Sequence, residues 1–486
     1  GLGFYSAFMV AEKVEIITKS FRDEPAAHWT CDGSPEYTLV AHDKNERGSE
    51  IILHIDEDSK EFLEEARIKA LLEKYNKFMP IPINFGKKKE TIPLAEDAAE
   101  DAKPETITVD NIINNPSPAW TKQPSELKEE DYNGFYRELY PMQFEEPLFN
   151  IHLNVDYPFN LTGILYFPKL NNDLNLQKDK IQLYQNQVFV TDNVEGIVPE
   201  FLTLLRGVID SPDIPLNVSR SYLQADGAVK KISNYITRKV ADKLSSLFKK
   251  DRAAFEQKWN DIKVVIEYGM LSEDKFYDKA EKFALYPTVD GSFFTLEELK
   301  EATKDLQTDK DEKHIILYAS NVDEQHAYIE AAKEKGYQVI LLDSPIVSHL
   351  IQKLESSNEK LSFARVDGDA IENLIKKEEA TVSKLSEEEK EKLQPLIEEV
   401  VPKEKYTIQL EALSSTQLPF VLTQPEFMRR MKEMQQAGGN AMFGQMPEMY
   451  NLVVNTNHPL VEQILHTKTE KKRTRLIQQT LDLARL

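Results

Sequence analysis

The sequence predicts a multidomain chain of mixed α/β and α+β class. Its 486 residues are about three times the length of a typical domain. Hydrophobic residues make up 41% of the chain, which is enough to fill several cores and excludes wholesale disorder. Segments in which apolar and polar residues alternate, as in strands, are interspersed with segments of helical periodicity. We therefore expect about three folded domains.

Charge and cysteine content limit the classes of protein and partner. With 60 basic and 82 acidic side chains, the formal net charge is −22, which argues against nucleic acid as a partner. The single cysteine, Cys31, permits no internal disulfide and favours a reducing compartment. The chain has no apolar run long enough to span a bilayer, so we expect a cytoplasmic protein without a membrane partner. Histidines at metal-ligand spacing and a Gly-x-Ser-x-Gly elbow are both absent from the sequence, so we expect neither a metal site nor hydrolase chemistry.

Residues 1–85 are expected to form an α+β unit. An apolar helix over 4–10 leads into segments of alternating polarity, and a charged helix follows before Pro80 and Pro82. The expected strands cover 13–20, 37–42 and 50–56, and the charged helix covers 61–78. The chain begins without Met in a glycine turn that enters a helix, so we expect its natural start to lie upstream.

Composition changes at residues 86–115. The run GKKKETIPLAEDAAEDAKPETITVD has almost no large apolar residues and alternates blocks of opposite charge. Such composition is typical of a flexible charged linker.

Globular patterning resumes in residues 116–368. Ser125, followed by acidic residues, indicates the start of a helix. Two segments predict strands, two predict helices, and a later trio predicts a β-α-β unit with Gly336 as the helix C-cap. The strands cover 161–168 and 181–192, the helices 201–209 and 229–248, and the β-α-β unit 314–343.

Residues 369–486 are expected to form a third domain. A highly charged helical stretch over 366–392 marks its boundary. The domain then contains a methionine-rich stretch, a strand over 450–457 and a final basic amphipathic helix over 470–486.

The opening Gly1-Leu2-Gly3-Phe4 could carry chemistry. Glycines at the start of a helix let backbone N–H groups approach a phosphate at its positive end. The alternative is a glycine turn without a ligand.

A second candidate lies in GVIDSPDIPLNVSRSYLQ, residues 207–224. Arg220, just before a predicted helix, could bind an anion as an arginine finger. The alternatives are a salt bridge from Arg220 to Asp210 or Asp213, and a purely capping role for Ser219.

The methionine-rich stretch offers a third candidate. Six of the ten methionines lie between residues 428 and 449. Met428 and Met431 share a helical face, and Phe443 centres a second apolar patch. Because methionine side chains adapt to many shapes, the stretch suits a sticky client-binding surface, although most methionine stripes are core.

Four segments in order resemble the ninety-kilodalton heat-shock chaperone family, most closely its bacterial type. They are GLGFYSAFMVAEKV, RGSEIILHI with EFLEEARIKALLEKYNKFMPIPI, PAWTKQPSEL and GVIDSPDIPLNVSRSYLQ. The second half of the chain matches more loosely, through VILLD, VDGD and NTNHPLV.

This resemblance implies a domain layout. Residues 1–85 would be the C-terminal part of a GHKL-type ATPase domain, an α/β sandwich, followed by the linker 86–115. Residues 116–368 would be a middle domain with two α/β subdomains joined by helices. Residues 369–486 would be an α+β dimerisation domain, which family chains complete with further helices.

The resemblance also implies an activity. Family members are ATPases that bind partly folded clients and cycle a homodimer between open and clamped states. Gly1, Gly3 and Phe4 match the end of the glycine-rich ATP lid. Ser49 stands where the family has Thr beside the adenine.

Further matches lie in the middle of the chain. Arg220 matches the arginine that contacts the γ-phosphate, and Gln224 its companion one turn later. Phe189 matches an aromatic that couples the catalytic loop to the middle domain, whereas Gln187 replaces the family's usual Arg.

The family's general-base Glu, magnesium-holding Asn and adenine-reading Asp would lie upstream of Gly1. The chain alone is therefore expected neither to bind ATP with magnesium nor to hydrolyse it. Two other readings stay open. One is an ATP-independent holdase or scaffold. The other is a topoisomerase or mismatch-repair ATPase of the same superfamily, which should carry a basic DNA-facing domain that the net charge of −22 disfavours.

Overall fold

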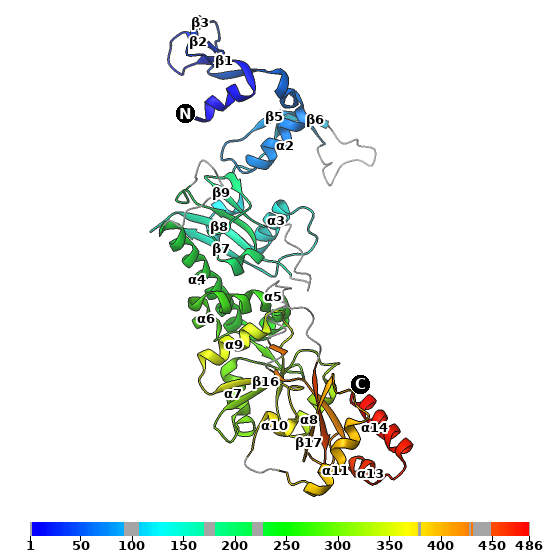
Figure 1. The fold of residues 1–486 in the computed structure, drawn as a ribbon. Coiled ribbons are helices and arrows are strands. Elements are labelled where there is room, and N and C mark those ends of the chain that lie inside the picture. Colours follow the sequence, from blue (N-terminus) through cyan, green and yellow to red (C-terminus); the bar gives the residue numbers. More distant parts are fainter. Residues whose placement is uncertain are drawn as a thin grey trace, which may run out of the picture.

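The computed structural model describes residues 2–91, 106–169, 180–215, 227–377, 381–426, 429–430 and 449–485. Figure 1 shows an elongated molecule in which the chain runs from a small sheet at the N-terminal end to a second α+β unit at the C-terminal end. Several separate sheets are each accompanied by helices, so the expected mixed α/β class is confirmed.

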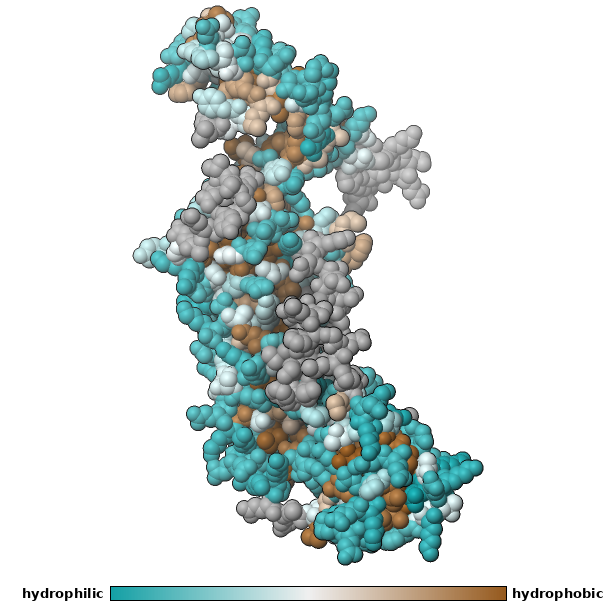
Figure 2. Space-filling view, viewed as in Figure 1, coloured by the Kyte–Doolittle hydropathy of each residue, from teal (hydrophilic) through white to brown (hydrophobic). Residues whose placement is uncertain are grey.

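The N-terminal unit is a four-stranded antiparallel sheet of order β3-β2-β1-β4. Three of its strands were predicted; the short β2 was not, because its run AAHWTC has little alternation. Apolar side chains of β3 and β4, among them Leu39, Val40 and Ile51, are exposed, and Figure 2 shows brown apolar surface on this part. The elements are α1 (Leu2–Tyr5), η1 (Ser6–Met9), β1 (Ala11–Lys19), β2 (Ala26–Cys31), β3 (Tyr37–His42) and β4 (Gly48–Ile55).

A helical connection and a hairpin follow this sheet. The helices are η2 (Glu57–Leu63) and α2 (Glu65–Tyr75), and the antiparallel hairpin pairs β5 (Asn84–Thr91) with β6 (Thr106–Ile112). The prediction of a flexible linker over 86–115 is therefore wrong at both ends, and residues 92–105 lie outside the described chain. Thr and β-branched residues in β6 favour extended backbone, which outweighs the charge-rich composition.

The middle of the chain holds a five-stranded sheet of order β10-β9-β11-β8-β7, in which only β11 and β9 run parallel. Helix α3 covers one face with an aromatic core, and α4 and α5 cover the other. The strands are β7 (Phe149–Val155), β8 (Leu161–Phe167), β9 (Ile181–Gln185), β10 (Val188–Thr191) and β11 (Arg206–Asp210). The helices are η3 (Ala119–Thr121), η4 (Pro124–Glu126), α3 (Glu129–Leu139), η5 (Glu200–Leu204), α4 (Gly227–Lys250) and α5 (Arg252–Ser272).

The helix predicted over 201–209 is wrong in its second half. The run begins as the short helix η5 but becomes strand β11, which is buried between two neighbouring strands. A strand buried on both faces is continuously apolar, so periodicity alone does not distinguish it from a buried helix.

A parallel β-α-β unit comes next, as predicted. Its sheet has the order β15-β14-β16, and Gly336 ends α8 with a positive φ of 75°. The strands of this sheet are β14 (His314–Ala319), β15 (Val339–Leu341) and β16 (Leu361–Arg365), and a separate antiparallel pair before it consists of β12 (Tyr286–Pro287) and β13 (Phe293–Phe294). The helices are α6 (Asp274–Ala280), α7 (Leu296–Gln307), α8 (His326–Glu334) and α9 (Val347–Ser357).

The last unit is α+β, with a three-stranded sheet of order β17-β19-β18 packed against helices. The predicted strand at 450–457 and the final helix are present as β19 and α14. The strands are β17 (Tyr406–Glu411), β18 (Phe420–Thr423) and β19 (Tyr450–Asn455). The helices are α10 (Ile371–Leu374), α11 (Glu387–Glu398), α13 (Pro459–His466) and α14 (Glu470–Ala484). None of the helices in the described ranges is both long and apolar enough to cross a bilayer.

Candidate functional site

The buried carboxylate of Asp210 organises the end of β11. Asp210 Oδ2 accepts a hydrogen bond from Trp120 Nε1 at 3.2 Å and one from the Gln187 backbone N–H at 2.9 Å. Burial raises the pKa of Asp210, while these two hydrogen bonds act in the opposite direction. The carboxylate thus ties the turn after β9 and the helix η3 to the strand that leads toward Arg220.

Gln187 connects this carboxylate to the preceding unit. Asn186 and Gln187 both have positive φ, of 51° and 64°, and form the two-residue turn between β9 and β10. The turn directs Gln187 so that its Nε2 donates to the backbone oxygens of Phe78 at 2.8 Å and Pro116 at 3.0 Å. The neutral amide therefore bridges segments on both sides of the β5–β6 hairpin.

Aromatic packing strengthens the same contact. The ring centroids of Phe78 and Trp120 lie 4.8 Å apart, in a core shared with α3 and the five-stranded sheet. The ring centroid of Phe189 on β10 lies 6.0 Å from that of Tyr75, at the end of α2, and 5.7 Å from that of Tyr184. We call Phe78, Trp120, Gln187 and Asp210 the Asp210 junction.

The predicted phosphate-contacting residues Arg220 and Gln224 lie in 216–226, outside the described chain. The two carboxylates considered as salt-bridge partners of Arg220 accept other hydrogen bonds. Asp210 accepts the two described above, and Asp213 accepts one from the Asn160 backbone N–H at 2.6 Å.

The predicted nucleotide contacts at the start of the chain are only partly described. Gly1 lies outside the described residues, whereas Gly3 is exposed, and nothing lies within 4 Å of where its Cβ would be. Phe4 packs edge-on against Trp29, with ring centroids 5.9 Å apart. Ser49 Oγ lies 2.7 Å from Thr18 Oγ1 across strands β4 and β1.

These residues do not by themselves fit ATP. Of the predicted nucleotide contacts, Gly3 offers an exposed backbone and Ser49 offers a hydroxyl that is already hydrogen-bonded to Thr18. A nucleotide site needs walls that exclude water and polar groups that read the base, which these residues do not supply. Among the described side chains, no three His, Cys, Asp or Glu residues are arranged to hold a metal ion.

The predicted client-binding residues Met428, Met431 and Phe443 also lie outside the described residues. Met449, at the end of that stretch, is 47% exposed. The beginning of the stretch is anchored, because Arg430 bonds to Glu355 of α9 at 3.0 Å.

Sequence reasoning overlooked Trp120 and Phe78 and gave Asp210 and Gln187 other roles. A tryptophan between two prolines and a polar turn, in PSPAWTKQP, is an available signal for an anchored aromatic. The hydrogen bonds of Gln187 join segments remote in sequence, so no local pattern could reveal them.

Comparison with known proteins supplies the family context. The family model described as Hsp90 protein matches residues 95–484. A relative from Bacteroides fragilis, strain YCH46, named chaperone protein htpG, is 57% identical over 470 residues, covering 96% of this chain and 68% of the relative. Chaperone protein HtpG of Porphyromonas gingivalis, strain ATCC 33277, is 52% identical over all of this chain and 70% of the relative. The Geobacter sulfurreducens protein of that name is 31% identical over 76% of this chain and 58% of the relative.

Proposed function

The chain belongs to the Hsp90 protein family, of the bacterial HtpG type, and on that premise we propose that it acts as a molecular chaperone. Its partners would be partly folded client proteins and a second copy of the chain, in the cytoplasm. The support is identity of more than half over nearly the whole chain with relatives that are named chaperones.

We further propose that client remodelling is driven by ATP hydrolysis in a homodimeric clamp. The Asp210 junction carries this proposal, because it fastens the segment after α2, at Phe78, to the strand that runs into the segment with Arg220. Movement of the N-terminal unit would pull on Gln187 and so displace the end of β11. Because the described residues alone do not fit ATP, base reading and magnesium binding would require residues beyond the described ones.

The domain boundaries remain part of this proposal. We assign 1–85 to the ATPase domain, 116–368 to the middle domain and 369–486 to the dimerisation domain. The stretch 86–115 between the first two would connect them through the β5–β6 hairpin rather than through a wholly irregular linker.

Replacing Arg220 tests the ATPase part of the proposal. In protein that carries the upstream segment, Arg220→Ala should slow hydrolysis at saturating ATP by at least about tenfold, because arginine fingers contribute more than that to phosphoryl transfer. Nucleotide affinity should change little, and Lys304→Ala, at an exposed position of α7, serves as the control. Unaltered turnover would contradict the assignment. The 486-residue chain alone should give no saturable ATP isotherm by calorimetry.

The client surface has a separate test. Replacing Met428, Met431 and Phe443 with Ser should weaken suppression of client aggregation, because the adaptable apolar contacts are lost. The melting temperature should fall by no more than a few degrees. If the three side chains are core, each replacement would instead cost about 2 to 5 kcal/mol of stability. A large melting-point loss would therefore withdraw the surface role.

A further inference from the structure

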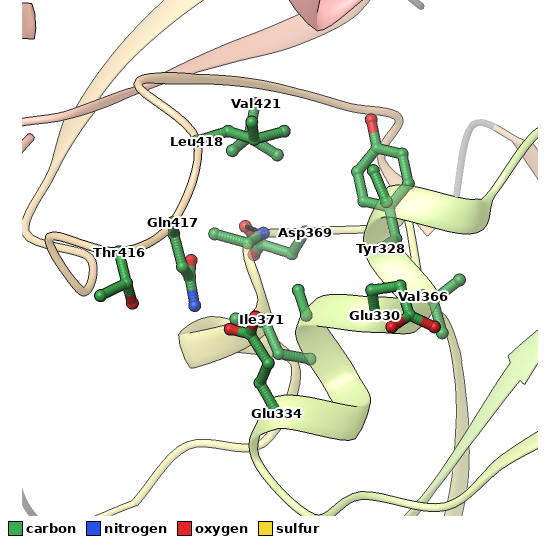
Figure 3. A pocket seen from close by; sticks show the side chains of 13 residues that line it. Tyr328, Glu330, Glu334, Val366, Asp369, Ile371, Thr416, Gln417, Leu418 and Val421 are labelled. Carbon is green, nitrogen blue, oxygen red and sulfur yellow. Dashed lines mark hydrogen bonds between the residues drawn. The ribbon is translucent and has the colours of Figure 1, made fainter.

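A cavity of about 240 Å³ lies between helix α8 and the segment before β18. Figure 3 shows Thr416, Gln417, Leu418 and Val421 facing α8 across it, with Asp369 and Ile371 between them. Its walls therefore come from both sides of the proposed boundary between the middle and dimerisation domains.

The cavity has an apolar floor. Ala327 and Ala331 lie four residues apart on one face of α8, and their small side chains leave the space open. Ile371 is buried, and Leu418, which is 50% exposed, forms part of the opposite wall. The floor suits an aliphatic side chain.

Acidic side chains surround this floor. Glu330 and Glu334 lie four residues apart on α8, and Asp369 lines the cavity from its own segment. Glu330 pairs with Lys333 at 3.3 Å, but Lys333 also pairs with Asp290 at 2.9 Å. Like charges at this helical spacing destabilise a helix slightly, so a cation bound between them would remove a cost.

A second layer of carboxylates adds to the negative potential. Gln417 Nε2 donates to Glu372 Oε1 at 2.9 Å, and the other oxygen of Glu372 is buried without a hydrogen-bond partner among the described residues. The pKa of Glu411 is raised chiefly by burial and further by the charges of Asp369 and Glu372. Lys335, at 3.5 Å from Glu372, offsets only part of this charge.

We propose that this cavity binds an unfolded peptide segment in which an aliphatic side chain is next to lysine or arginine. The volume of 240 Å³ is below the roughly 300 to 1,000 Å³ of pockets for drug-sized ligands, so it suits one or two side chains. The acidic rim selects the basic neighbour by charge complementarity. A bound peptide would contact both α8 and the segment before β18, and would hold the helix and this segment together.

The first test measures binding of dye-labelled peptides to the 486-residue chain by fluorescence anisotropy. The probe has the core Leu-Lys-Leu-Arg between Gly-Ser flanks, and its counterparts carry Leu-Glu-Leu-Glu or Ser-Lys-Ser-Arg. The basic aliphatic probe should bind at least about tenfold more tightly than either counterpart, and added salt should weaken it. Equal affinity for all three would overturn the proposal.

Variants then locate the binding. Glu330→Gln with Glu334→Gln should weaken the basic probe about threefold to tenfold, as expected for two partly exposed ion pairs. The matched control is Glu297→Gln with Glu301→Gln, the same charge change at the same spacing on α7, and it should leave affinity unchanged. Ala331→Phe should fill the floor and abolish binding. Unaltered affinity in the Glu330 and Glu334 double variant would overturn the site even if Ala331→Phe fails to fold. This inference rests on the proposed chaperone function. Loss of peptide binding in the variants with client-aggregation suppression unchanged would overturn only the role of this site in client binding, and no arm of the test uses ATP, so its failure is also distinguishable from failure of the ATPase proposal.

Discussion

Asp210 holds two donors that are remote from each other in sequence. Asp210→Ala would leave Trp120 Nε1 and the Gln187 N–H without their acceptor, at a cost of about 1 to 3 kcal/mol for each buried group. We therefore expect a loss of about 2 to 5 kcal/mol in the free energy of unfolding, measured by urea titration with tryptophan fluorescence. Asp210→Asn keeps an acceptor oxygen and should cost less. Equal losses in the two variants would contradict this account.

A second buried carboxylate makes stability depend on pH. Glu267 is 6% exposed on α5, and burial raises its pKa to about 7, while Ser344 and Lys263 oppose the shift. Because its folded pKa lies above the unfolded value of 4.5, the folded state takes up the proton first as the pH falls. Stability from this group is thus fully present below pH 4.5 and is lost as the pH rises through about 7.

Glu267→Gln should remove this dependence. Relative to the parent, the variant should gain up to about 3 kcal/mol between pH 5 and pH 8, since one pKa unit corresponds to about 1.4 kcal/mol. Urea unfolding at a series of pH values measures the difference. A difference between variant and parent that stays constant over this range would refute the assignment.

Individual residues differ in how far the sequence could place them. Gly336 was predicted as a helix C-cap from its position after a helical run. Glycine is favoured just after a helix because the backbone there often takes a positive φ, and Gly336 has a φ of 75°. The hydrogen bond between the Ser49 and Thr18 hydroxyls depends on strand register, which the local sequence does not state. Asp210 was considered only as an ion-pair partner, since nothing near it in sequence indicates that Trp120 lies beside it.

At the scale of elements, close approach of strands explains Gly207 in β11. A Cβ on Gly207, whose φ is +129°, would lie 2.0 Å from the backbone oxygen of Ile164 on β8. Gly207→Ala should therefore destabilise the five-stranded sheet by more than about 3 kcal/mol, since backbone must move and the residue is strained.

Gly134 provides the matched control. It lies within helix α3, and a Cβ there would meet nothing within 4 Å. Gly134→Ala should raise the free energy of unfolding by about 0.5 to 1 kcal/mol, because alanine favours helix. Thermal or urea unfolding of both variants checks the opposite signs, and a loss at both positions would contradict the packing argument.

Elements with clear periodicity were predictable, whereas those fixed by neighbours were not. Helix α4 and strands β1, β8 and β14 follow from alternation or helical spacing in the sequence. Strand β11 was read as a helix because its burial comes from pairing with β8, where Arg206 lies opposite Tyr166, and with β9, where Gly207 lies opposite Ile181. The hairpin at the ends of 86–115 depends on cross-strand pairing, which outweighs a charged composition.

In the whole molecule, polar contacts join successive units. The Asp210 junction fastens the segment after α2, at Phe78, to the middle sheet, and Arg430 fastens the last unit to the β-α-β unit. Arg430 donates to Glu426 Oε1 at 2.7 Å, to Glu355 Oε2 at 3.0 Å and to the backbone oxygen of Phe363 at 2.9 Å. Its side chain is only 20% exposed.

Removing Arg430 should therefore uncouple the last unit from the rest. Arg430→Met leaves Glu355 and Glu426 without this partner, and breaking a partly buried pair costs about 2 to 4 kcal/mol. We expect calorimetry to show a separate transition for the C-terminal unit at lower temperature, whereas Lys304→Gln, which breaks the exposed pair with Glu301, should leave the profile nearly unchanged. Adding Glu355→Gln should recover part of the loss, because one uncompensated charge is gone. A uniform shift of the whole profile would instead show that the loss of Arg430 destabilises all units equally. This contact would then not govern the coupling between them.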